Sequence, residues 1–181
     1  WFGKRDDETT SLGDWRVNEK KLPGGLKRLG EELAGMGVKL GIWMEPEMIS
    51  PDSDLYRSHP DYAMTIPGRT PTQARNQLVL DLTRKEVRDC VYDQISAVLR
   101  SAPICYLKWD MNRPLIDVYS SALPPDRQGE AAHRYVLGLY ELQERLVDDF
   151  PDLLLENCCS GGGRFDAGML YYSPQIWTSD N

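Results

Sequence analysis

Short apolar runs that end in polar residues alternate along this sequence with longer stretches whose apolar residues recur at helical spacing. The apolar runs are residues 38–44, 104–110, 153–157 and 174–178. The helical stretches cover residues 26–36, 85–100 and 127–149. Because parallel strands need long crossover connections, which are usually helices, this alternation predicts an α/β fold with a parallel sheet.

Each apolar run ends in a group of polar or aromatic residues. The groups are Trp43-Met44-Glu45, Lys108-Trp109-Asp110, Glu156-Asn157-Cys158 and Thr178-Ser179-Asp180. In a parallel β/α barrel the carboxyl ends of the strands form one face, and active sites are built there. The four groups therefore predict an enzyme site at that face.

Lys108 and Asp110 lie two positions apart, so on one strand both side chains point to the same face. Opposite charges inside a barrel are costly unless they serve each other or a ligand. The pattern leaves a structural ion pair and a catalytic pair equally open. Trp43, at the end of the first run, is either a core residue or an aromatic platform for a sugar.

Asp180 supplies a second carboxylate near the end of the last run. Glycoside hydrolysis uses two carboxyl groups: one attacks or assists at the anomeric carbon, and the other protonates the leaving oxygen. Ser179-Asp180-Asn181 is also an ordinary turn or helix-capping string, so the residues alone leave both interpretations open.

Three consecutive glycines, Gly161 to Gly163, follow the third run. Glycines free backbone N–H groups to face an anion, but this segment matches neither G-x-G-x-x-G nor the Walker pattern. They would equally let a sugar approach the backbone closely. We expect the adjacent Cys158 and Cys159 to pack or to line a pocket and not to pair with each other.

The polar segment of residues 45–77 is long for a simple connection, and such loops are usually functional. Glu45 and Glu47 flank Pro46 and could form an acid pair, although we expect a solvated loop. The two histidines, His59 and His133, are not tied to a serine or a cysteine. A Ser-His-Asp hydrolase and a histidine-rich metal site are therefore unsupported.

The composition restricts the partners. The formal net charge of −7 disfavours nucleic acid, whose binding depends on Lys and Arg. No apolar run approaches the roughly 18 residues of a membrane helix. Four cysteines without a C-x-x-C spacing suggest neither a disulfide scaffold nor zinc, and reduced thiols favour the cytoplasm.

Five strings of the sequence carry a family resemblance. They are GIWMEPEM (41–48), RNQLVLDL (75–82), LKWDMNR (107–113), ENCCSGGGRFD (156–166) and WTSDN (177–181). Together and in this order they resemble the α-galactosidases of glycoside hydrolase family 36, which also holds the raffinose synthases. The resemblance runs over essentially the whole chain.

The resemblance implies a catalytic (β/α)8 barrel that acts by double displacement, with Asp110 as nucleophile and Asp180 as general acid/base. We expect no cofactor and no metal. The resemblance also implies sugar contacts from Trp43, Arg75, Lys108, Asn112, Cys158 and Gly161. Lys108 is expected to help keep Asp110 ionised, and Asp180 is expected to need a less polar setting to hold its proton.

One departure from the family pattern is that family members carry an Asp-Asp-Gly before the string that is here Trp1-Phe2-Gly3. We therefore expect residues 1–181 to be the central part of the catalytic barrel, about half of it. The N-terminal β domain and the C-terminal domain of the family would then be absent, and the isolated segment would be inactive.

The expected function of the longer protein is retaining hydrolysis of terminal α-D-galactosyl residues from oligosaccharides such as melibiose or raffinose. That protein could be a homo-oligomer. The alternatives are a galactosyl transferase of the raffinose-synthase kind, a sugar-binding but inactive barrel fragment, and a phosphate-binding barrel that uses the glycine loop.

Overall fold

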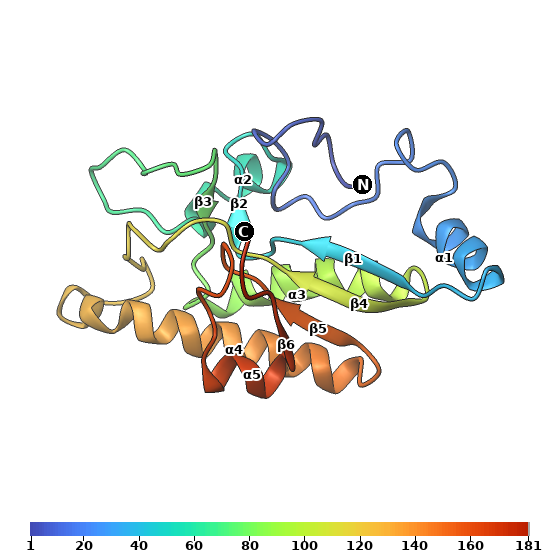
Figure 1. The fold of residues 1–181 in the computed structure, drawn as a ribbon. Helices are drawn as coiled ribbons and strands as arrows, with labels where there is room; N and C mark the ends of the chain where they lie inside the picture. Colours follow the sequence, from blue (N-terminus) through green and yellow to red (C-terminus); the bar gives the residue numbers. More distant parts are fainter. Residues whose placement is uncertain (181) are drawn as a thin grey trace.

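The computed structural model describes residues 1–180, and in them it contains a four-stranded parallel sheet. The strands are β1 (Leu40–Met44), β4 (Ile104–Trp109), β5 (Leu154–Asn157) and β6 (Gln175–Ile176), in the order β1-β4-β5-β6. All three pairings are parallel, so the carboxyl ends of the strands lie at one edge of the sheet (Figure 1). The predicted α/β class with a parallel sheet is confirmed.

The outer strands are shorter than the apolar runs that predicted them. Before β1, Gly37 has a φ of 75°, and the N–H of Val38 donates to the carbonyl of Leu33 at 2.9 Å. These contacts belong to the end of a helix, which is why the strand starts at Leu40. The last strand, β6, pairs only through Gln175 and Ile176.

The helices largely follow the sequence prediction. They are α1 (Gly25–Gly35), α3 (Lys85–Arg100), α4 (Ala131–Asp149), which the 3-10 helix η2 (Pro125–Glu130) precedes, and α5 (Ala167–Tyr172). Helices α3 and α4 pack on each other along one face of the sheet (Figure 1). Their apolar stripes are buried there, with Val91 and Ile95 on α3 and Leu142 and Leu146 on α4. No helix within residues 1–180 is long and apolar enough to cross a membrane.

Thr83, a residue type that often caps helices, lies two positions before the first residue of α3. Thr83 does not cap the helix, because the N-cap residue is Arg84, and no side chain accepts a hydrogen bond there. The Thr83 hydroxyl instead donates to Asp81 Oδ1 at 2.6 Å. The hydroxyl of Thr83 therefore bonds to the nearby carboxylate of Asp81 and not to the backbone at the start of the helix.

The long segment between β1 and α3 carries small elements of its own. These are β2 (Met48–Ile49), α2 (Asp54–Ser58), the 3-10 helix η1 (Pro60–Tyr62) and β3 (Leu78–Val79). Strands β2 and β3 pair antiparallel, and all four of their residues are buried. This pairing draws the chain that directly follows β1 into the interior.

Candidate active site

Asp110 directly follows β4 at the carboxyl edge of the sheet. Its N–H donates to the carbonyl of Met44 at 2.8 Å, and the N–H of Cys158 donates to the carbonyl of Trp109 at 2.8 Å. These two bonds extend the pairing of β4 with both neighbouring strands past its last residue. The backbone of Asp110 is therefore fixed from both sides, and the residue is only 7% exposed.

The carboxylate of Asp110 accepts hydrogen bonds from four groups. Trp43 Nε1 and Asn112 Nδ2 donate to Oδ2 at 3.0 and 2.8 Å, and the Met111 N–H donates to Oδ1 at 2.9 Å. The thiol of Cys158 also donates to this carboxylate. Trp43 lies on β1 and Cys158 follows β5, so three neighbouring strands build the site.

The donors determine the charge state of Asp110. Burial raises the pKa of this carboxyl, but the hydrogen bonds from Trp43, Asn112, Cys158 and Met111 outweigh burial, so the pKa lies below its ordinary value. Burial, with Asp110 adding to it, raises the pKa of the Cys158 thiol to about 11, so Cys158 is a protonated donor. The site holds an ionised carboxylate at neutral pH.

Asn112 links the carboxylate to two other residues. Its side-chain oxygen accepts from Arg75 Nη1 at 3.2 Å, while its N–H donates to Glu45 Oε1 at 2.6 Å. Arg75 lies in a turn in which it has a φ of 51°, a conformation that few residues other than glycine adopt. The turn presents an exposed guanidinium beside the site.

Lys108 lies in register with Trp43 on β1 and with Glu156 on β5. Its Nζ atom is 3.7 Å from Glu156 Oε1 and 4.1 Å from the ring centroid of Trp177. Glu156 is 2% exposed, so the ammonium compensates a buried carboxylate on the neighbouring strand. The ion pair that the sequence left open is therefore made with Glu156, not with Asp110.

Asp180 lies beside the glycine loop that follows β5. Gly162 N–H donates to the carbonyl of Thr178 at 3.0 Å, and a Cβ atom at Gly161 would lie 3.4 Å from Asp180 N. The Asp180 carboxylate itself is exposed and accepts from Trp177 Nε1 at 2.9 Å. The less polar setting that we expected for Asp180 is not found in residues 1–180.

The family model described as melibiase matches residues 1–181. The chain belongs to the melibiase family. It is 60% identical to α-galactosidase 1 of Pediococcus pentosaceus and 56% identical to α-galactosidase AgaA of Geobacillus stearothermophilus, in each case over 100% of this chain and 25% of the relative. It thus spans about a quarter of the length of these relatives.

Solved structures of the melibiase family agree with this assignment. The crystal structure of the GH36 α-galactosidase AgaA superposes with a TM-score of 0.98 over 100% of this chain and 25% of that chain, at 56% identity. The galactosidase domain of AgaSK, a bifunctional α-galactosidase/sucrose kinase of Mediterraneibacter gnavus, gives a TM-score of 0.93 at 60% identity over 100% of this chain and 24% of that chain. Variants of AgaA have been crystallised with raffinose and with stachyose.

The residues that the family resemblance singled out form one connected set in the structure. Asp110 contacts Trp43, Asn112 and Cys158, and Asn112 contacts Arg75. The Gly161 N–H bonds to the Cys158 sulfur, and Gly161 lies against Asp180. Lys108 stacks on Trp177, which donates to Asp180. The set comprises all eight residues, Trp43, Arg75, Lys108, Asp110, Asn112, Cys158, Gly161 and Asp180.

The expectation that Glu45 and Glu47 lie in a solvated loop is wrong. They are 1% and 0% exposed, because the pairing of β2 with β3 holds this segment in the interior of the protein. Burial raises the pKa of Glu45 to about 7, and the nearby charge of Asp110 adds to this, while the hydrogen bond from the Asn112 N–H opposes it. Glu45 is therefore a second carboxyl group at the site that sequence reasoning did not use.

Glu47 also has partners that the sequence does not reveal locally. Its carboxylate accepts from Trp109 Nε1 at 2.7 Å and pairs with Arg164, 117 residues further along the chain. The one signal in the sequence was that Glu45 directly follows an apolar run and Glu47 lies two positions further, both within one of the family strings. The polar, proline-containing context concealed it.

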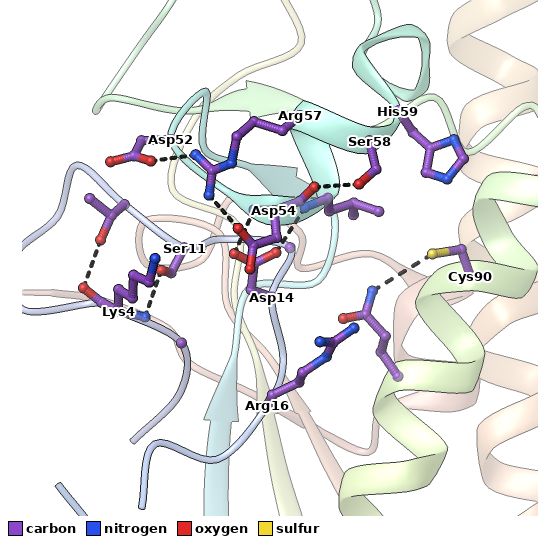
Figure 2. A pocket seen from close by; sticks show the side chains of 15 residues that line it. Lys4, Ser11, Asp14, Arg16, Asp52, Asp54, Arg57, Ser58, His59 and Cys90 are labelled. Atoms are coloured by element: carbon purple, nitrogen blue, oxygen red, sulfur yellow. Dashed lines mark hydrogen bonds and ion pairs between the residues drawn. The ribbon is translucent and has the colours of Figure 1, made fainter. Parts of the chain in front are cut away.

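A cavity of about 330 Å³ lies elsewhere, among the N-terminal segment, α2 and α3, and none of the eight residues lines it. Figure 2 shows Asp14 in its middle, where the carboxylate accepts from the N–H groups of Asp54 and Leu55 at 2.8 and 3.0 Å. Arg57 pairs with Asp52 and Asp54 at 2.6 and 2.5 Å. These charges stabilise the start of α2.

The structure offers no metal site within residues 1–180, where no three His, Cys, Asp or Glu side chains are grouped to hold an ion. All four cysteines are free thiols. The expectation that Cys158 and Cys159 do not pair with each other is confirmed.

Proposed function

We propose that residues 1–181 form the central part of a catalytic (β/α)8 barrel in a longer protein, called the parent enzyme below. The support is that the chain aligns throughout with one quarter of the α-galactosidases it matches. The sheet also has two outer strands, β1 and β6, that pair on one side within the described residues. Further β/α units would pair with these edges, and an N-terminal β domain and a C-terminal domain would complete the parent enzyme.

The parent enzyme hydrolyses terminal α-D-galactosyl residues with retention of configuration. Asp110 is the nucleophile and Asp180 the general acid/base. The observation that carries this assignment is the carboxylate of Asp110, which four donors hold ionised at the carboxyl end of β4. A carboxylate that attacks the anomeric carbon must be ionised, so that it only accepts hydrogen bonds, and it must be held rigidly in place. The site meets these requirements.

The reaction takes place in two displacements. In the first, an Asp110 oxygen forms a bond to the anomeric carbon while the bond to the leaving oxygen breaks, and Asp180 gives that oxygen its proton. In the second, Asp180 removes a proton from water, whose oxygen forms the new bond to the anomeric carbon and releases Asp110. Two inversions return the α configuration.

The sugar contacts are Trp43, Arg75, Lys108, Asn112, Cys158 and Gly161. Arg75 and Lys108 bring donors to the edge of the site, and Gly161, which has no Cβ, lets the backbone of Ser179 and Asp180 lie close to the glycine loop. The substrates are galacto-oligosaccharides such as melibiose or raffinose. In support, variants of the related AgaA were crystallised with raffinose and stachyose.

The four free cysteines support a reducing compartment, and the cytoplasm remains the proposed location.

The test is the pair Asp110→Ala and Asp180→Ala in the parent enzyme, assayed with an aryl α-galactoside. Asp110→Ala should lose turnover, and added azide should then give the β-galactosyl azide, because a single displacement inverts the anomeric carbon. Asp180→Ala should keep the first step for aryl groups that leave without a proton, and azide should then give the α-galactosyl azide. Normal turnover by Asp110→Ala would disprove the assignment of Asp110 as the nucleophile.

A further inference from the structure

The buried carboxylate of Glu47 is bound by a guanidinium from a distant loop. Arg164 Nη1 lies 2.5 Å from Glu47 Oε1 and Nη2 lies 2.7 Å from Oε2, which makes the pair bidentate. Glu47 is 0% exposed, and the side chain of Arg164 is 12% exposed. The contact joins the segment after β1 to the glycine loop after β5.

Two further groups complete the hydrogen bonding of Glu47. Trp109 Nε1 donates to Oε1 at 2.7 Å, and the hydroxyl of Tyr135, on α4, donates to Oε2 at 2.5 Å. One carboxylate therefore collects donors from β4, from α4 and from the glycine loop. Such a geometry is rigid, because every donor constrains the same two oxygen atoms.

The pair contacts the residues on both sides of Asp110. Trp109 precedes Asp110 and donates to Glu47, and Met111 follows it and has its sulfur in contact with Arg164 Nη2. The same loop starts with Cys158, which hydrogen-bonds Asp110. The Glu47–Arg164 pair therefore connects the end of β4 to the glycine loop and fixes their relative position.

A contribution to stability alone does not explain why this ion pair is buried. Burying two charges costs several kcal/mol per ion, and replacing such a pair by neutral side chains is often neutral or stabilising. An interaction whose geometry is constrained while its net stabilisation is small fits a positioning function.

We propose that the Glu47–Arg164 pair is a positioning element of the active site. It sets the Asp110 carboxylate and the Cys158–Gly161 part of the glycine loop relative to each other. The inference rests on the proposed function of Asp110 as nucleophile. Neither Glu47 nor Arg164 touches the substrate; both act through their neighbours.

The test compares two double variants of the parent enzyme. Glu47→Gln with Arg164→Met removes both charges together, so no unpaired ion remains, and the new amide can still accept from Trp109 and donate to the Tyr135 hydroxyl. The control is Asp89→Asn with Arg145→Met, which removes an ion pair of 2.8 Å between α3 and α4, away from the site. The first double variant, called the site variant below, and the control are both assayed for kcat, KM and melting temperature.

The site variant should lose kcat by about 10- to 100-fold, the loss expected from a displacement of about 1 Å, while KM changes less than about threefold. The control should keep wild-type kcat. A single Arg164→Lys variant, which keeps the charge but not the bidentate geometry, should lie between wild type and the double variant. Wild-type kcat in a folded site variant would overturn the proposal.

A second measurement does not depend on activity. Amide hydrogen exchange in residues 109–112 and 158–166 should become faster in the site variant and stay unchanged in the control. Unchanged exchange in the site variant would overturn the positioning function even if the parent enzyme is active. Inactivity of the wild type would refute the proposed function while leaving the exchange result interpretable.

Discussion

Gly161 lies directly against the backbone of Asp180. A Cβ atom at this position would lie 3.4 Å from Asp180 N and 3.3 Å from Ser179 Cα, and the φ of Gly161 is 76°. Because the Gly161 N–H also bonds to the sulfur of Cys158, one loop contacts both a donor to Asp110 and the backbone of Asp180. The two proposed catalytic carboxylates are therefore connected through Gly161.

Gly161→Ala in the parent enzyme should lower kcat by about tenfold, which corresponds to about 1.4 kcal/mol of lost transition-state stabilisation. The reason is strain from a positive φ, about 1 kcal/mol, combined with a methyl group that crowds the Cα atom of Ser179, the residue before Asp180. Steady-state kinetics and a melting curve measure both effects. Gly129→Ala is the control, since a Cβ there meets nothing within 4 Å; equal kinetics for the two variants would contradict the prediction.

Trp43→Phe removes the 3.0 Å hydrogen bond from the indole to Asp110 Oδ2. Because that bond helps to lower the pKa of Asp110, its loss should raise the pKa and move the acid limb of the pH profile of kcat/KM to higher pH. The maximal kcat/KM should fall by about 10- to 100-fold, the equivalent of one hydrogen bond to a charged group.

Trp15→Phe is the matched control for that experiment. Trp15 packs 6.3 Å from Trp43, ring centroid to ring centroid, but its indole N–H has no hydrogen-bond partner within residues 1–180. The control should keep the acid limb in place. If both variants moved it equally, ring packing and not the bond to Asp110 would set the pH dependence.

Glu45→Gln should change how stability depends on pH. Burial raises the pKa of Glu45 from 4.5 to about 7, so the folded state favours the protonated form. This contribution, at most about 3 kcal/mol, is fully present below the ordinary pKa and is lost as the pH rises through about 7. The amide oxygen still accepts from the Asn112 N–H but never ionises.

The wild-type parent enzyme should therefore lose melting temperature between about pH 5 and about pH 8, relative to Glu45→Gln. Melting curves at both pH values measure the difference. Glu19→Gln, at an exposed position, serves as the control and should follow the wild type. A Glu45→Gln variant that melts below wild type at the higher pH would show that the carboxylate is stabilised in a way that the structure does not contain.

The sequence predicted the parts of the fold that depend on local patterns. Residues 85–100 form a helix with the predicted bounds because the apolar stripe of α3 is continuous. Asp110 was found because an apolar strand ends directly before it. Glu45 and Glu47 were wrongly expected in a solvated loop because their partners, Asn112 and Arg164, lie 67 and 117 residues away. Burial that results from such distant contacts does not produce a periodic pattern of apolar residues in a short polar segment, so the sequence does not reveal it.

The proposal that the chain is a segment of a barrel can be tested in a chimera. Residues 1–181 replace the matching quarter of AgaA, to which they are 56% identical with a TM-score of 0.98. Because the two backbones superpose this closely, the chimera should fold and cleave an aryl α-galactoside, whereas the same chimera with Asp110→Asn should not. The isolated chain should be inactive, since half a barrel leaves strand edges unpaired. Turnover by the isolated chain, or a folded but inactive chimera, would refute the assignment of the segment.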